Sequence, residues 1–172
     1  SPGILIHELI GHLCEGERGA TLLRGPGRED RPDVSPLLSV VDDPEGVAGN
    51  GGYLYDDEGV APEKVVLLDG GRFAARVADR WSSSSALTSH RHGRRQSYRD
   101  APMPRLGATI ALAGTDDPEE IVRTTPEGIL VQEINRGRCD QASGEFVVQV
   151  TRARKIEQGR LTRALHEFLL IG

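Results

Sequence analysis

Residues 7–12, with the sequence HELIGH, place two histidines and a glutamate within one apolar stretch. Neutral imidazole nitrogens are common zinc ligands. A glutamate beside them can act as general base on a metal-bound water. These residue types therefore predict a hydrolytic zinc site with His7 and His12 as ligands and Glu8 as the catalytic base.

The spacing of the two histidines sets a condition on the backbone. The usual zinc-peptidase motif has its histidines four residues apart on one helix face, whereas His7 and His12 are five apart. In a regular α-helix that spacing leaves their side chains roughly 140° apart. A π-bulge would bring them closer, and Gly11 could tolerate the distortion. The alternative is an ordinary helix that carries two scattered polar residues.

The elements around this motif predict how it is held. Apolar residues support a helix as far as Cys14, and their spread over most of its sides indicates a buried helix. The segment 18–36 is rich in glycine, proline and charge, which predicts a long loop that could cover the site.

The rest of the chain predicts an α+β fold, made of mostly antiparallel β-sheet with the buried amino-terminal metal-binding helix and one further short helix. Single strands are expected at 37–42, 53–56, 109–112 and 128–134, hairpins at 64–79 and 146–165, and the second helix at 116–123.

Composition limits the classes of partner and location. The chain has 172 residues, which suits a single domain, and a formal charge of −5, which argues against direct binding of nucleic acid. No apolar run approaches the roughly 20 residues that span a bilayer. Two cysteines make no disulfide framework, so a cytoplasmic location is expected.

Several blocks resemble, in the same order, those of the TldD/PmbA metallopeptidase family, and in particular its TldD-like branch with the motif HExxxH. They are GILIHELIGHLCEG at 3–16, VDD at 41–43, DDEGV at 56–60, GRRQSY at 93–98, PMPR at 102–105, DQASG at 140–144 and LIG at 170–172. The resemblance covers essentially the whole chain. It implies that residues 1–172 form one TldD-like domain without the family's amino-terminal domain and its last carboxy-terminal segment.

The resemblance also implies a function. Family members are zinc-dependent peptidases that act on unfolded or leader-type peptides, so one Zn²⁺ per active site is expected, although two histidines also suit other divalent transition metals. The expected partner is a PmbA/TldE-like subunit or a second copy of the chain. The family's third metal ligand is a cysteine in the missing segment. The alternative is therefore a non-catalytic peptide-binding or assembly module.

Further residues are candidates for supporting roles. Glu15 could orient a histidine ligand, or it could simply be a solvated helix end. The family blocks also contain five polar residues that could hold a substrate carboxylate or an oxyanion, or could lock loops to acidic partners such as Asp42 and Asp43. These five are Arg94, Arg95, Ser97, Tyr98 and Arg105.

The remaining metal-binding residue types have ordinary explanations. Cys14 is expected to be a buried small hydrophobe. Cys139 could reach the metal only if its loop folds over the helix. The prediction places His90 and His92 in a surface loop, and treats 56–58 as a solvated acidic turn.

Overall fold

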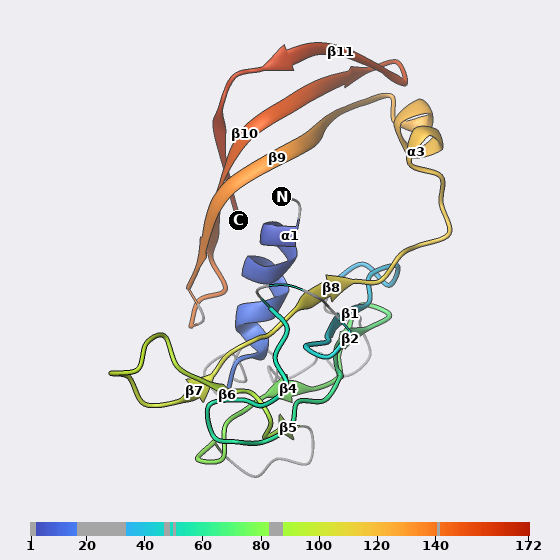
Figure 1. Cartoon of the computed structure of the whole chain (residues 1–172). Coiled ribbons are helices and arrows are strands. Elements are labelled where there is room, and N and C mark those ends of the chain that lie inside the picture. The colour runs from blue at the N-terminus through green and yellow to red at the C-terminus, as the bar shows by residue number, and fades with distance from the viewer. Residues whose placement is uncertain (1–2, 17–33, 47–48, 50, 83–87, 141) are drawn as a thin grey trace.

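The structure, a computed structural model, describes residues 3–16, 34–46, 49, 51–82, 88–140 and 142–172. Its amino-terminal helix lies between two groups of strands, β9–β11 on one side and β1, β2 and β8 on the other (Figure 1). Most of the expected loop at 18–36 falls outside the described residues. Within the described ranges, no helix is long and apolar enough to cross a membrane.

The amino-terminal helix changes its winding twice over twelve residues. It begins as the α-helix α1 (Gly3–Ile6), continues as the π-helix η1 (His7–Gly11) and ends as the 3₁₀-helix η2 (His12–Cys14). Gly16, with φ +60°, follows the helix. The helix expected as far as Cys14 is confirmed, and so is its π-turn at the histidine motif.

A four-stranded antiparallel sheet lies on one side of this helix. Its strands are β1 (Val40–Asp42), β2 (Val65–Asp69), β3 (Arg72–Phe73) and β8 (Thr109–Ala111), in the order β3-β2-β1-β8. Aliphatic side chains of β1 and β2 are buried against the helix residues Ile10 and Cys14. This sheet therefore forms the first hydrophobic core.

A second antiparallel sheet packs on the other side of the helix. It contains β9 (Glu127–Cys139), β10 (Phe146–Glu157), β11 (Arg160–Leu165) and β12 (Phe168–Ile171). β10 pairs with β9 along one edge, and with β12 and then β11 along the other. Its core residues are Ile134, Val148, Val150 and Ala153.

Shorter elements lie outside these two sheets: four short strands follow β3 in the chain, and one helix stands between β8 and β9. β4 (Arg76–Val77) pairs in parallel with β5 (Thr88–Ser89), and β6 (Gly93–Arg94) pairs antiparallel with β7 (Met103–Pro104). The helix α3 (Pro118–Thr124) begins after Asp117, whose carboxylate accepts a hydrogen bond from the backbone N–H of Glu119.

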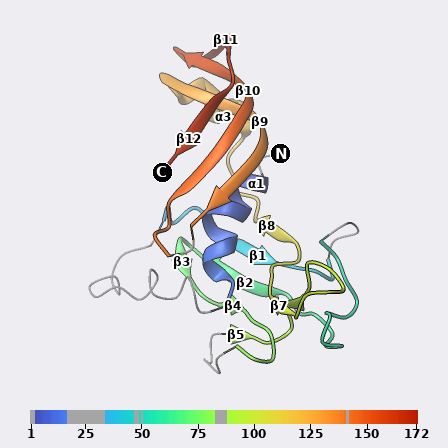
Figure 2. The same ribbon diagram turned by 90° about the vertical axis from the view of Figure 1, so that its left-hand side faces the viewer.

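The helix bridges both cores, which is why it can hold a site between the sheets. Its residues Ile6, Leu9 and Ile10 pack on the first core, and Ile4 and Leu5 pack on the second. Figure 2 shows the helix running from the β9–β10 layer down to β2. The α+β arrangement with mostly antiparallel strands and one further short helix is confirmed.

Three local expectations about strands differ from the structure. Residues 53–56 form no strand, because Asp56 turns the chain by accepting backbone N–H bonds from Glu58 and Val60. The segment 72–79 is divided into β3 and β4, and β4 leaves the hairpin to pair with β5. The short strands β5, β6 and β7, and the strand β12, were not predicted.

Candidate metal centre

The π-helix brings the rings of His7 and His12 into direct contact. The backbone N–H of His12 donates to the carbonyl of His7, five residues earlier, as a π-turn requires. The ring centroids lie 4.6 Å apart with an interplanar angle of 68°. The backbone distortion therefore overcomes the roughly 140° separation that a regular α-helix would impose.

Both rings are oriented through Nδ1. Nδ1 of His12 lies 2.8 Å from Oε2 of Glu15, and Nδ1 of His7 lies 3.2 Å from Oγ1 of Thr109. Because an ionised carboxylate only accepts hydrogen bonds, Nδ1 of His12 carries the proton in this pair. Nε2 of His12 is therefore the nitrogen that would ligate a metal, and the contact of Nδ1 with Thr109 likewise leaves Nε2 of His7 for that role.

Glu8 is buried beside His12. Its Oε2 lies 3.5 Å from Nε2 of His12, and the residue is 9% exposed. Strand β9 covers it at Gly137, where an added Cβ would lie only 2.5 Å from Cγ of Glu8. The absence of a side chain at Gly137 thus makes room for the glutamate.

The two histidines experience opposite electrostatic environments. Burial lowers the pKa of His7, and the neighbouring His12 lowers it further. The hydrogen bond to Glu15 raises the pKa of His12, against the effect of its burial. His7 is thus the ring that more readily stays neutral, which is the form that binds metal.

An adjoining cleft of about 600 Å³ could hold a ligand next to His12. Three parts of the chain supply its walls: the end of the helix, the segment around β7, and the end of β9. The lining residues are His12, Glu15, Met103, Pro104, Arg105, Cys139, Asp140 and Ala142. Arg105 is the only lysine or arginine among the described residues that line this cleft.

The other four predicted substrate-binding residues do not line this cleft. Arg94 donates from Nη1 to the carbonyl of Leu106 at 2.6 Å, and its guanidinium lies over the ring of Tyr53. It locks a loop, although through a carbonyl and an aromatic ring rather than through Asp42 or Asp43.

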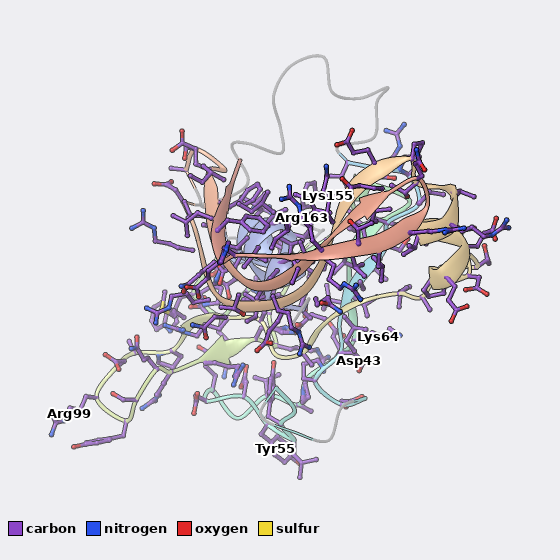
Figure 3. The ribbon with its side chains drawn as sticks, turned by 90° about the horizontal axis from the view of Figure 1, so that it is seen from above. Asp43, Tyr55, Lys64, Arg99, Lys155 and Arg163 are labelled. Carbon is purple, nitrogen blue, oxygen red and sulfur yellow. The ribbon has the colours of Figure 1, made fainter. Side chains whose placement is uncertain are left out.

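Arg95, Ser97 and Tyr98 are exposed on the neighbouring loop. The hydroxyl of Ser97 donates to Asp100, and the Tyr98 hydroxyl accepts from Arg99. Arg99 points outward from the body of the molecule (Figure 3).

The predicted acidic partners make other contacts. Asp43 pairs with Lys64 at 3.6 Å, and the two lie side by side in Figure 3. Asp42 is buried and contacts His92. His92 is 0% exposed, so its expected place in a surface loop was wrong. Its backbone N–H donates to the carbonyl of Ala78, which ties this segment into the interior.

The remaining candidates divide between buried and half-buried positions. Cys14 is fully buried as expected, and burial raises its pKa to about 12. Cys139 does fold toward the helix and lines the cleft, where burial raises its pKa. Nδ1 of His90 lies 2.8 Å from the carbonyl of Asp79. Asp56 is 7% exposed, so the expectation of a solvated turn was wrong at this residue, whereas Asp57 is exposed as expected.

Within the described residues, the site lacks a complete set of metal ligands and contains one orienting residue that the sequence did not predict. No group of three or more His, Cys, Asp or Glu residues suited to a metal occurs among the residues that the structure describes. Thr109 orients His7 but lies 102 positions further along the chain, so the sequence did not indicate this contact. No spacing pattern marks such a contact.

Comparison with known proteins adds a family match. Residues 2–172 match the model of the PmbA/TldA metallopeptidase C-terminal domain. The chain is 33% identical over 175 residues to a metalloprotease TldD homolog of Haemophilus influenzae, covering 99% of this chain and 36% of that protein. It is 28% identical over 173 residues to a metalloprotease of Methanocaldococcus jannaschii, covering 99% and 38%.

A solved structure has a similar fold. The crystal structure of TldE from Thermococcus kodakarensis superposes with a TM-score of 0.75 at 25% identity, covering 99% of this chain and 39% of that one. The chain therefore spans little more than a third of the length of these relatives.

Proposed function

Because the chain belongs to the PmbA/TldA metallopeptidase family through that family's C-terminal domain, we propose that it is a zinc-dependent peptidase domain. The observation that carries this proposal is the contact between His7 and His12 across a π-turn. A distortion of the helix that pairs two imidazoles has an evident use in metal binding, since π-bulges are frequent at functional sites.

The chemistry of these side chains fits zinc. Two imidazoles are ordinary zinc ligands, and metal-bound histidines commonly place their second nitrogen against a carboxylate or another acceptor. His12 has such a partner in Glu15, and His7 has one in Thr109. His7 and His12 would therefore hold the metal through Nε2. A third ligand would come from outside the described residues or from a partner.

Glu8 acts as the general base in this proposal. Zinc, when bound, supplies Lewis acidity toward the peptide carbonyl and toward water. Glu8 accepts the proton of the attacking water and then returns it to the leaving amine. Its burial under Gly137 excludes bulk solvent, and its position beside His12 places the carboxylate next to the ligand atom.

The substrate is an unfolded or leader-type peptide that lies in the cleft beside His12. Arg105 binds a carbonyl or carboxylate oxygen of the peptide there, since its guanidinium lines the same cleft. Strand β9 ends at this cleft and pairs only with β10 among the described strands. An extended peptide can therefore pair with the main chain of β9, and such backbone hydrogen bonds select little among side chains. Unchanged cleavage of peptides with N-methyl groups would contradict this pairing.

We also propose an assembly with a TldE-like subunit, or with a second copy of the chain. The similarity to TldE over nearly the whole of this domain supports a pair of related folds.

The proposed location is the cytoplasm. Both Cys14 and Cys139 are free thiols, which suits a reducing compartment.

Peptide cleavage by the Glu8→Gln variant tests the proposed function. We expect zinc to bind as in the wild type while the rate of peptide cleavage falls about 100-fold or more, as for loss of a general base. Glu119→Gln is the matched control, because Glu119 is an exposed glutamate in α3. The assay uses an unfolded peptide, with and without the proposed TldE-like partner.

Wild-type cleavage by Glu8→Gln would contradict the assignment of the base. A chain that binds zinc and peptide but never cleaves, even with the partner, would support the non-catalytic alternative instead.

A further inference from the structure

A single segment crosses the helix and contacts the candidate metal centre at several points. We call residues 103–109 the crossing segment. Its Leu106 N–H donates to Oε1 of Glu15 at 3.1 Å, and its Thr109 hydroxyl lies 3.2 Å from Nδ1 of His7. The side chain of Leu106 also packs against Gly11. The crossing segment therefore supplies Thr109, which contacts His7, and holds Glu15, which contacts His12.

Buried groups on its far side hold this segment in place. Oδ2 of Asp42 accepts the backbone N–H of Gly107 at 2.9 Å. The carbonyl of His92 accepts the backbone N–H of Arg105 at 3.0 Å. These two anchors flank Leu106, so the position of its N–H depends on both.

Asp42 is also linked directly to Thr109. In the pairing of β1 with β8, Asp42 lies opposite Thr109. The next residue, Asp43, donates its N–H to the carbonyl of Ala108 at 2.9 Å. Asp42 thus controls the crossing segment both through its carboxylate and through its place in the sheet.

The Asp42–His92 pair is unusual for a purely structural contact. Both side chains are 0% exposed, and Nε2 of His92 lies 3.2 Å from Oδ2 of Asp42. Neither Nε2 of His92 nor Oδ1 of Asp42 has a hydrogen-bond partner among the described residues. Burying polar atoms without hydrogen-bond partners costs stability, so a benefit elsewhere is expected.

We propose that Asp42, supported by His92, is a positioning residue for the metal centre. It holds Gly107 and Thr109 so that Thr109 stays on His7 and the Leu106 N–H stays on Glu15. The inference rests on the proposed function, because it assigns these contacts a purpose in metal binding. It adds Asp42 and His92 to the residues that decide zinc affinity, although neither is a ligand.

The test compares Asp42→Asn with Ile156→Ala. The asparagine has the same shape without the charge, whereas Ile156 is a buried core residue of β10 away from the centre. Zinc affinity is measured by chelator competition, together with the melting temperature. We expect Asp42→Asn to weaken zinc binding about tenfold, the lower end for residues behind metal ligands. Ile156→Ala should leave the affinity within about twofold.

A loss of affinity in Asp42→Asn no larger than in Ile156→Ala would overturn the inference. His92→Gln provides a second variant if Asp42→Asn does not fold, with the same expectation and the same criterion. In the double variant Asp42→Asn/Thr109→Val, the loss of zinc-binding free energy should be smaller than the sum of the losses in the two single variants. Both substitutions act on His7 through the same contact, so their effects should not add.

A readout without metal separates this inference from the proposed function. In the metal-free protein, the ¹⁵N chemical shift of Nδ1 in His7 reports its hydrogen bond to Thr109. We expect Asp42→Asn to change that shift and Ile156→Ala to leave it unchanged. If the wild type binds no zinc even with the proposed partner, the proposed function fails, and this shift alone decides whether Asp42 positions His7. An unchanged shift would then overturn the inference.

Discussion

The rings of His7 and His12 contact each other at a centroid distance of 4.6 Å, although five residues separate them in the chain. The π-turn η1 makes this possible, because its i→i+5 repeat places residues five apart on the same face. Packing on both sheets holds the distorted helix in place. The contact therefore depends on the fold as a whole as well as on the local motif.

Gly137→Ala is expected to impair catalysis while leaving metal binding intact. The added Cβ would lie 2.5 Å from Cγ of Glu8, so the carboxylate must move. A misplacement of about 1 Å can cost on the order of 100-fold in rate. Peptide cleavage and zinc content are measured together. Gly128→Ala is the control, since it lies on the same strand and its nearest contact is a Thr125 methyl at 3.0 Å.

Loss of zinc from Gly137→Ala would contradict this prediction, because Glu8 would then be needed for metal binding rather than for proton transfer.

Glu15→Gln is expected to weaken zinc binding about 10- to 100-fold, as for other residues behind histidine ligands. The glutamine oxygen can still accept the Leu106 N–H, but its NH₂ group would then face Nδ1 of His12. An imidazole that accepts at Nδ1 carries its proton on Nε2, which prevents ligation. Zinc affinity by chelator competition measures the effect, and Glu145→Gln, an exposed glutamate, is the control. Unchanged affinity in Glu15→Gln would show that Glu15 does not fix the tautomer.

In the metal-free protein, His12 is expected to take up its proton at a higher pH than His7. The hydrogen bond to Glu15 raises the pKa of His12, and burial lowers the pKa of His7. The stability contributed by His12 is fully present below its ordinary pKa of about 6.5 and is lost as pH rises through the raised value. His7 has the opposite sign: as pH falls below about 6.5, the unfolded chain binds its proton first, which destabilises the fold.

An NMR titration of the histidine ring signals measures both groups, and Glu15→Gln should lower the His12 midpoint. Protonation of His7 at a higher pH than His12 would contradict the described geometry.

Cys139 is expected to react with iodoacetamide in the folded protein, whereas Cys14 is not. Burial raises the pKa of Cys14 to about 12 and excludes the reagent, while Cys139 is only partly buried in the cleft. The thiolate is the reactive form, so labelling at about pH 8 favours the more exposed group. Mass spectrometry of the labelled peptides gives the measurement, with unfolded protein as the control. Equal labelling of both cysteines in the folded protein would mean that the helix end is not packed as described.

The raised pKa of Cys14 also predicts how the free energy of unfolding changes at high pH. The folded state retains the thiol proton after the unfolded chain has lost it, so the free energy of unfolding decreases as pH rises above the ordinary cysteine range. Denaturant unfolding of Cys14→Ala beside the wild type would reveal a smaller decrease in the variant.

The motif and the helix could be predicted from the sequence because both depend on neighbouring residues. The spacing of His7 and His12 required a π-turn if they were to meet, and Gly11 made one possible. The β10–β11 hairpin was also local, with its turn at Gln158 and Gly159 in left-handed conformations. The family resemblance came from ordered blocks, and the family match covers residues 2–172.

The contacts that complete the centre could not be predicted, because they join distant segments. Thr109 meets His7 only through the path of the crossing segment, and Gly137 meets Glu8 only through the β9–β10 pairing. His92 was misplaced for the same reason. Its polar, glycine-flanked neighbours suggested solvent, but its tertiary contact with Asp42 buries it completely.

Metal content tests the central claim most directly. The chain is purified without added metal, given limiting zinc, dialysed and measured by plasma mass spectrometry, beside His7→Ala, His12→Ala and the control His90→Ala. We predict one zinc per chain in the wild type and in His90→Ala, and loss of zinc in both His7→Ala and His12→Ala. Zinc retained by both of those variants, or absent from the wild type even with the proposed partner, would contradict a metal centre built on this histidine pair.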